Sequence, residues 1–174
     1  MKCKSCKSEF EPVKRNGIIV SKYCFSCLIT KGKEKRVKEA RKEKKDAQEA
    51  LKTHSEWLND LQRVFNTYIR ERDKGKPCIS CGNPLTGKFD AGHYFSVGAY
   101  PNLRFNELNV HGQCVACNQH KHGNINEYSI NLPLRIGNTA FDDLLNDRNK
   151  QKKLSTVEIK ELIKRYKELK KELQ

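Results

Sequence analysis

The segment from Asp90 to Asn124 gathers residue types that could together hydrolyse a phosphodiester. His93 lies near the end of a strand-like run, and Asn109 follows it sixteen residues later. Such a hydrolysis needs a deprotonated water, charge stabilisation at the phosphate and help for the leaving oxygen. A neutral imidazole, with an ordinary pKa of about 6.5, can take a proton from water near neutral pH. We therefore expect His93 to act as a general base. The side-chain carbonyl of Asn109 is expected to accept the other imidazole N–H and fix the tautomer.

The same segment holds candidate ligands for a catalytic divalent cation. A helix is expected to begin at Cys117 and run to about His122, so that Asn118 and His122, four residues apart, share one face. Asp90 is the nearest carboxylate, and hard cations prefer oxygen ligands. In a regular strand Asp90 faces the side opposite His93, so a bulge or a twist would be needed to bring Asp90 to the metal. These residues predict a site for Mg²⁺ or Mn²⁺.

Other basic and imidazole side chains nearby could serve the same chemistry. The guanidinium of Arg104 matches a phosphate in bidentate fashion, so it is a candidate phosphate clamp. Lys121 is also expected to contact phosphate, and His120 is an alternative ligand. Three interpretations remain for His111: it lies close to the zinc, it faces DNA, or it lies in a surface turn.

Eight cysteines form four CxxC pairs, a pattern more typical of zinc sites than of a disulfide framework. The pairs predict two sites of four thiolates each: an N-terminal site of Cys3, Cys6, Cys24 and Cys27, and a core site of Cys78, Cys81, Cys114 and Cys117. A four-thiolate zinc has no open position for water, so both sites are expected to be structural. The core zinc would clamp the two ends of a ββα unit.

The composition favours a small core and a polyanionic partner. Of the 174 residues, 36% are hydrophobic and 32% are charged, and the formal net charge is +14. Such an excess of positive charge attracts polyanions, of which nucleic acid is the usual one. No run approaches the ~18 apolar residues that would span a bilayer, and from the charged residues around Cys3 we expect no signal peptide. We expect no membrane partner and a reducing cytoplasm, where thiols stay free to bind metal.

Four segments are expected along the chain, in a small, zinc-rich α+β fold. Residues 1–29 predict a zinc ribbon, and residues 30–54 a basic charged helix or linker. Residues 55–150 form the core that carries the site, and residues 151–174 a C-terminal amphipathic helix. That last helix could pack on the core or on a second subunit.

Within these segments, apolar periodicity predicts individual elements. A helix is expected from Ser55, as N-cap, to about Arg72, with its aromatic stripe in the core. A strand is expected over residues 89–95 and a second short element over residues 105–110. Residues 127–145 predict a loop followed by a short helix, and residues 155–174 a terminal helix capped at its N-terminus.

The motifs PCISCG, DAGHY, LRFNE and QCVACNQHK, with a following RIG, resemble the NinG/Rap recombination proteins of lambdoid phages, within the HNH (His-Me finger) nucleases. This resemblance implies an HNH ββα-metal core, cleavage of branched DNA such as Holliday junctions and D-loops, a divalent cation and a homodimer. By position, His93 matches the HNH histidine, Asn109 the middle asparagine, and Asn118 and His122 the ligand positions. One departure is Gly92, where many HNH enzymes carry Asp or His. Asp90 is therefore the expected first metal ligand.

Two functions of different class follow. The leading hypothesis is a structure-selective DNA endonuclease in the cytoplasm of the phage host, with phage or host recombination proteins as further partners. The rival is a non-catalytic, zinc-binding DNA-binding or recombination accessory protein, for which the missing acid before His93 is the one argument. A third hypothesis, an HNH partner in phage DNA packaging, predicts cleavage of linear duplex without junction preference.

Overall fold

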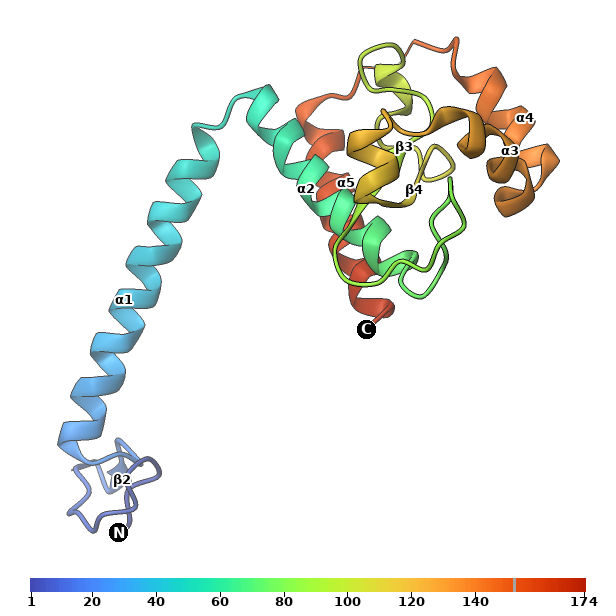
Figure 1. The fold of residues 1–174 in the computed structure, drawn as a ribbon. Helices are drawn as coiled ribbons and strands as arrows, with labels where there is room; N and C mark the ends of the chain where they lie inside the picture. The colour runs from blue at the N-terminus through green and yellow to red at the C-terminus, as the bar shows by residue number, and fades with distance from the viewer. Residues whose placement is uncertain (152) are drawn as a thin grey trace. The chain divides into compact units, whose positions relative to one another are not determined.

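The computed structural model of the chain describes residues 1–151 and 153–174. It comprises two compact units, Met1–Lys52 and Thr53–Gln174, which are treated separately below. Figure 1 traces the course of the chain through both. No helix in the described part of the chain is long and apolar enough to cross a membrane.

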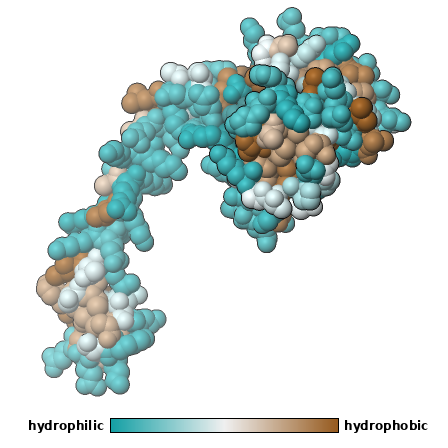
Figure 2. Space-filling model, in the orientation of Figure 1, coloured by the Kyte–Doolittle hydropathy of each residue, from teal (hydrophilic) through white to brown (hydrophobic). Residues whose placement is uncertain are grey.

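The N-terminal unit is a small cysteine-rich hairpin followed by one long helix. Strands β1 (Lys14–Arg15) and β2 (Ile18–Ile19) pair antiparallel around Asn16 and Gly17, both of which have positive φ, as an Asn-Gly hairpin turn requires. Helix α1 (Phe25–Ala50) buries none of its residues, and its surface is mostly hydrophilic (Figure 2). Of the two alternatives expected for residues 30–54, a charged helix or a linker, the structure shows an exposed helix, which begins earlier, at Phe25, and so includes Cys27.

Two amphipathic helices form the main core of the second unit. Helix α2 (His54–Arg72) begins at a capping box between Thr53 and Glu56, so that Thr53 takes the place of the expected cap Ser55. Helix α5 (Thr156–Glu172) begins at a capping box between Ser155 and Glu158, as expected. The buried side chains that the two helices share are Trp57, Leu61, Phe65, Tyr68, Ile69, Ile159, Ile163 and Tyr166. The apolar stripe of α5 therefore packs on α2 of the same chain.

An antiparallel hairpin lies against this helix pair. Strand β3 (Phe89–His93) pairs with strand β4 (Val110–Cys114), and Ala91 and Val110 join the core of α2 and α5. The strand expected over residues 89–95 ends at His93. The second strand begins at residue 110, where the expected element ended, because the intervening chain turns through a short 3-10 helix, η1 (Pro101–Leu103).

Three further helical segments follow the hairpin. The first, η2 (Ala116–His120), is a π-helix, shorter than the helix expected to reach His122. Helices α3 (Ile125–Ile136) and α4 (Asn138–Asp147) replace the expected loop and short helix. The loop expectation was wrong because α3 accommodates Pro133 while burying Tyr128 and Leu132 in a second apolar cluster. An interior proline costs about 3 kcal/mol, which burial of two large side chains can offset.

Candidate functional site

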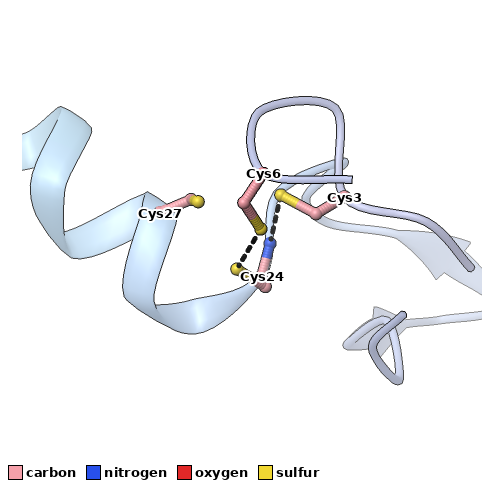
Figure 3. A group of neighbouring side chains, drawn as sticks. All are labelled: Cys3, Cys6, Cys24 and Cys27. Carbon is pink, nitrogen blue, oxygen red and sulfur yellow. Dashed lines mark hydrogen bonds between the residues drawn. The ribbon is translucent and has the colours of Figure 1, made fainter. Parts of the chain in front are cut away.

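The four N-terminal cysteines converge as a metal-binding cluster. Their ligand atoms all lie within 4.8 Å of one another, and their sulfurs turn toward a common space (Figure 3). The Sγ atoms of Cys6 and Cys24 are 3.6 Å apart, and the backbone N–H of Cys24 donates to Sγ of Cys3 at 3.3 Å. Burial opposes ionisation of the Cys3 thiol, but N–H donors such as that of Cys24 outweigh it and lower the pKa to about 6. This set of donors can hold a zinc ion.

The four core cysteines form a second such cluster, again with all ligand atoms within 4.8 Å. Cys81 and Cys114 have their sulfurs 3.8 Å apart, and the N–H of Cys114 donates to Sγ of Cys78 at 3.4 Å. The cluster joins the loop before β3 to the end of β4 and to η2, where Cys117 lies. It thus ties together the two ends of the hairpin segment, and both predicted sets of four cysteines can hold zinc.

His93, the last residue of β3, is held in one orientation by a backbone carbonyl. Its Nε2–H donates to the carbonyl oxygen of Arg104 at 2.9 Å, which leaves the Nδ1 lone pair as the acceptor. Burial lowers the pKa of His93; the hydrogen bond to the Arg104 carbonyl opposes this shift, and the positive charge of Arg104 adds to it. The ring is therefore a neutral imidazole of fixed tautomer near neutral pH.

The side chain of Asn109 bonds to other groups than His93, so the expected hydrogen bond between them was wrong. The side chain of Asn109 is fully buried: its Oδ1 accepts from the N–H of Phe95 at 2.7 Å, and its Nδ2 donates to the carbonyls of Phe95 and Leu103 at 3.0 and 3.1 Å. These three bonds hold the chain before η1, at Phe95, and the last residue of η1, Leu103, which directly precedes Arg104. Because the Arg104 carbonyl holds His93, Asn109 positions His93 indirectly.

Asp90 meets Asn118 and Gln119 from η2. Its Oδ2 accepts from Nδ2 of Asn118 at 3.0 Å and from Nε2 of Gln119 at 2.7 Å. Within the described residues, no lysine or arginine lies at ion-pair distance from Asp90. Rotating the Asn118 amide by half a turn would place its Oδ1 beside the carboxylate, and oxygen donors of this kind suit a hard divalent cation. Sequence reasoning missed Gln119, since spacing along a regular helix does not predict a π-helix.

The strand register separates these groups. Asp90, opposite Gln113, and Gly92, opposite His111, share one face of the hairpin, whereas His93 is opposite Val110 on the other face. In the described structure no hydrogen bond joins His93 to Asp90 or Asn118. The expectation that Asp90 faces away from His93 is confirmed, and β3 contains no bulge that would correct it.

The remaining predicted site residues lie around the turn after η2. The expected helical face shared by Asn118 and His122 was wrong, because η2 ends at His120 and His122 adopts a left-handed φ of 49°. Lys121 caps the end of η2, and both it and His120 are exposed. Their roles toward a metal or a phosphate stay predictions.

A buried side chain explains the glycine at position 92. A Cβ at Gly92 would lie 2.1 Å from Oε1 of Gln113, a fully buried residue. The amide of Gln113 is fixed there, since its Nε2 donates to Oγ of Ser80 and to the carbonyl of Gly123. The space for an acid at position 92 is thus occupied, a relationship that no pattern in the sequence indicates.

A buried ionic network anchors α2 to β4. Arg72 donates to both carboxylate oxygens of Asp73 at 2.8 and 2.9 Å, and Asp73 also accepts from the N–H of Gly112 at 2.8 Å. His111 is 4% exposed and accepts at Nδ1 from Arg72 at 3.2 Å. His111 therefore belongs to the interior and not to a DNA-facing surface.

The comparisons with known proteins agree with one another. A model of the family described as Bacteriophage Lambda NinG protein matches residues 1–174. Protein ninG of Escherichia phage lambda is 48% identical over 103 residues, which are 59% of this chain and 50% of the lambda protein. Protein ninG of Escherichia phage 933W is 38% identical over 173 residues, covering 87% of this chain and 83% of that protein.

Protein ninG of Salmonella phage P22 is 45% identical over 124 residues, 71% of this chain and 61% of the P22 protein. The match to the lambda protein thus spans half of that relative's length. No solved structure matches. The NinG part of the sequence resemblance is confirmed, whereas the HNH nuclease assignment stays a prediction. The family model extends over the whole chain, which therefore belongs to the bacteriophage lambda NinG family.

Proposed function

We propose that this protein is a structure-selective DNA endonuclease that cuts branched DNA in phage recombination. The observation that carries the proposal is the state of His93. A backbone carbonyl holds its Nε2–H, burial keeps the ring neutral, and Nδ1 stays available as a base. In the part of the chain that the structure describes, no hydrogen bond engages Nδ1 of His93, so this nitrogen can accept a proton from water.

In the proposed reaction, Nδ1 of His93 takes a proton from a water molecule. The water oxygen forms a bond to phosphorus as one phosphorus–oxygen bond of the DNA backbone breaks, and the leaving oxygen takes up a proton from solvent. The carbonyl of Arg104 keeps Nε2–H bonded throughout and stabilises the imidazolium that forms.

A divalent cation, Mg²⁺ or Mn²⁺, would neutralise charge on the phosphate and on the leaving oxygen. Asp90 and Asn118 are the residues that would hold it. The proposal is supported by the Asp90 carboxylate, which has only neutral amide partners in the described structure, and by the oxygen that a rotated Asn118 amide would offer. His122 is a further candidate ligand. The two zinc ions would stay structural, because four thiolates leave no open coordination position.

The edge of β3 that has no strand partner offers one way for DNA to reach both faces of the hairpin. Strand β3 pairs with β4 alone among the described strands, so its other edge has no strand neighbour. A DNA backbone that crosses this edge could contact His93 on one face and the Asp90–Asn118 pair on the other. The proposal requires this path.

Binding to DNA is supported by charge. The chain carries a net +14, and α1 exposes a mixture of charges in which lysine and arginine outnumber acids. Contacts to phosphate from such residues, and from Arg104 and Lys121, would recognise shape and not sequence. Symmetric cleavage of a junction needs two sites, so we also propose a homodimer, with phage or host recombination proteins as further partners.

The test is cleavage of a labelled four-way junction and its matched linear duplex, with Mg²⁺ or Mn²⁺, by the wild type and by His93→Ala. We expect the wild type to cut the junction in preference to the duplex, and His93→Ala to bind it but not cut it. Asn126→Ala, at an exposed position of α3 with no role in the proposed site, is the control and should cut. Tight junction binding without cutting in either metal would favour the accessory-protein function. A monomer bound to junction DNA in sedimentation would contradict the proposed homodimer.

A further inference from the structure

A pocket of about 410 Å³ lies between the start of α2, the chain after η1 and the chain before α5. Its lining combines the apolar side chains of Leu58, Phe105 and Leu154 with the cations Arg104 and Lys153 and with His54. None of the described residues that line it is acidic. The pocket thus pairs an apolar interior with positive charge.

The walls of this pocket are fixed by hydrogen bonds and packing. Nε2–H of His54 donates to the carbonyl of Leu154 at 2.8 Å, which ties the start of α2 to the chain before α5. Leu58, Phe105 and Leu154 also pack against the main core. The pocket is therefore formed before any ligand enters, so binding need not order its walls.

Arg104 presents its guanidinium in a defined position. Its Nε donates to Oε1 of Gln62 at 2.7 Å, and its Cζ lies 5.2 Å from the centre of the Phe105 ring. No acidic partner holds the group in the described structure. A guanidinium and an aromatic ring placed together offer the two kinds of surface on which a nucleobase stacks.

The pocket is also coupled to the proposed base. The carbonyl of Arg104 is the group that holds Nε2–H of His93, while the side chain of the same residue lines the pocket. A ligand that orders Arg104 from the pocket side would therefore act on the residue that fixes the His93 tautomer.

We infer that this pocket takes an unpaired nucleobase of DNA, with the neighbouring phosphate on its cationic rim. A base inside a continuous duplex is stacked on both faces and cannot enter, whereas a base at a branch point is already unstacked. The inference rests on the proposed function in one respect: it names where branched DNA is distinguished from duplex. It does not require that cleavage occurs.

The test is a binding cycle without added Mg²⁺ or Mn²⁺, on a forked DNA and on the same fork with one unpaired base removed to leave an abasic site. The abasic position is moved one nucleotide at a time away from the branch. We expect removal of one particular base to weaken binding of the wild type by about 5-fold or more, the scale of one base stacked on protein side chains. The backbone phosphate is retained, so the loss reports the base alone.

The same binding measurements are repeated on Leu58→Trp, whose larger side chain fills the pocket. In this variant the intact and abasic forks should bind equally, and duplex affinity should match that of the wild type. Lys153→Glu, at the rim, should weaken fork binding more than duplex binding, whereas Lys164→Glu, exposed on α5 away from the pocket, should weaken both alike. If Leu58→Trp fails to fold by circular dichroism, the two lysine variants decide the outcome.

Equal binding of intact and abasic forks by the wild type at every position would overturn the inference, as would full discrimination in Leu58→Trp. The outcome is separable from that of the proposed function. If the wild type discriminates the intact from the abasic fork but cuts no DNA in any metal, the pocket inference stands and the nuclease proposal fails. If it cuts DNA without such discrimination, the nuclease proposal stands and the pocket inference fails.

Discussion

Oε1 of Gln113 occupies the space that a side chain at Gly92 would need, with only 2.1 Å between that oxygen and the position of a Cβ. Gly92 lies directly before His93, where the sequence lacks an acid. The side chain of Gln113 fills the space that an acidic side chain at position 92 would need. From there its amide bonds to Ser80 and to the carbonyl of Gly123. The glycine is a consequence of this buried bridge and does not by itself argue against catalysis.

We predict that Gly92→Ala is destabilising by about 1–3 kcal/mol, since it overpacks a site whose neighbour cannot move without losing two hydrogen bonds. Denaturant unfolding would measure this. Gly98→Ala is the matched control, since nothing lies within 4 Å of a Cβ there. Combining Gly92→Ala with Gln113→Ala should cost less than the sum of the two single changes. Equal stability of the Gly92 and Gly98 variants would contradict the packing relationship.

We predict that Asn109→Ala lowers stability and cleavage together, whereas His93→Ala lowers cleavage alone. Removing the Asn109 amide leaves the N–H and the carbonyl of Phe95 without their partner, and each buried group left unsatisfied costs about 1–3 kcal/mol. Thermal unfolding and junction cleavage, measured on both variants, separate the two roles. Asn126→Ala, exposed on α3, should change neither quantity. A fully stable Asn109→Ala variant would restore the direct role that sequence reasoning assigned.

Much of the scaffold could be predicted from the sequence because its signals are local. The apolar stripes of α2 and α5 follow helical spacing, and the two capping boxes are short-range bonds between neighbours. The cysteine pairs share one chemistry, so their grouping into two clusters follows from spacing. Each of these features depends on residues a few positions apart or on a single ligand preference.

The predictions that were wrong depend instead on contacts between residues that the fold brings together. Asn109 bonds to the chain beside η1 because the fold brings that chain to it, and no spacing distinguishes this from a bond to His93. The π-helix η2 moves Gln119 to Asp90 and turns His122 away, which a regular helix would not do. Pro133 led us to expect a loop, but the segment is helical because the helix buries Tyr128 and Leu132. Tertiary contacts override local preference in each case.

We predict a loss of stability between pH 6.5 and pH 4 that depends on His111. Burial, and next the charge of Arg72, lower the pKa of this imidazole to about 4. Because the folded pKa lies below the ordinary value, the unfolded chain takes up the proton first. The stabilisation is fully present above pH ~6.5 and is lost as the pH falls toward 4, by about 3 kcal/mol in all.

Thermal melting of the wild type and of His111→Gln across this range would test the assignment. The difference between the two should shrink as the pH falls, because the variant has no proton to take up there. Asp73 acts in a separate window, since its neighbours hold the pKa of its carboxyl well below the ordinary range and its contribution is lost only at lower pH. A pH-independent difference would show that His111 does not titrate in this way.

Removal of the two metals should have unequal effects, and we predict this from the way each cluster is embedded. Cys3 is the only buried residue in Met1–Lys52, all of which the structure describes, so this unit has no apolar core and its folding would depend on metal. The core cluster lies beside Ile79, which is buried with Tyr128 and Leu132 and whose N–H donates to the carbonyl of Gly112 at 3.1 Å.

Cys3→Ser should therefore reduce bound zinc from two ions per chain to one and leave the cooperative melting of Thr53–Gln174 unchanged, since all four N-terminal cysteines belong to the other compact unit. Cys78→Ser should also leave one ion but lower the melting temperature of that unit, because the ends of the β3–β4 hairpin lose their connection. Zinc content by atomic absorption and melting by calorimetry provide the two measurements. Equal thermal effects of the two variants would mean that both clusters support one cooperative core.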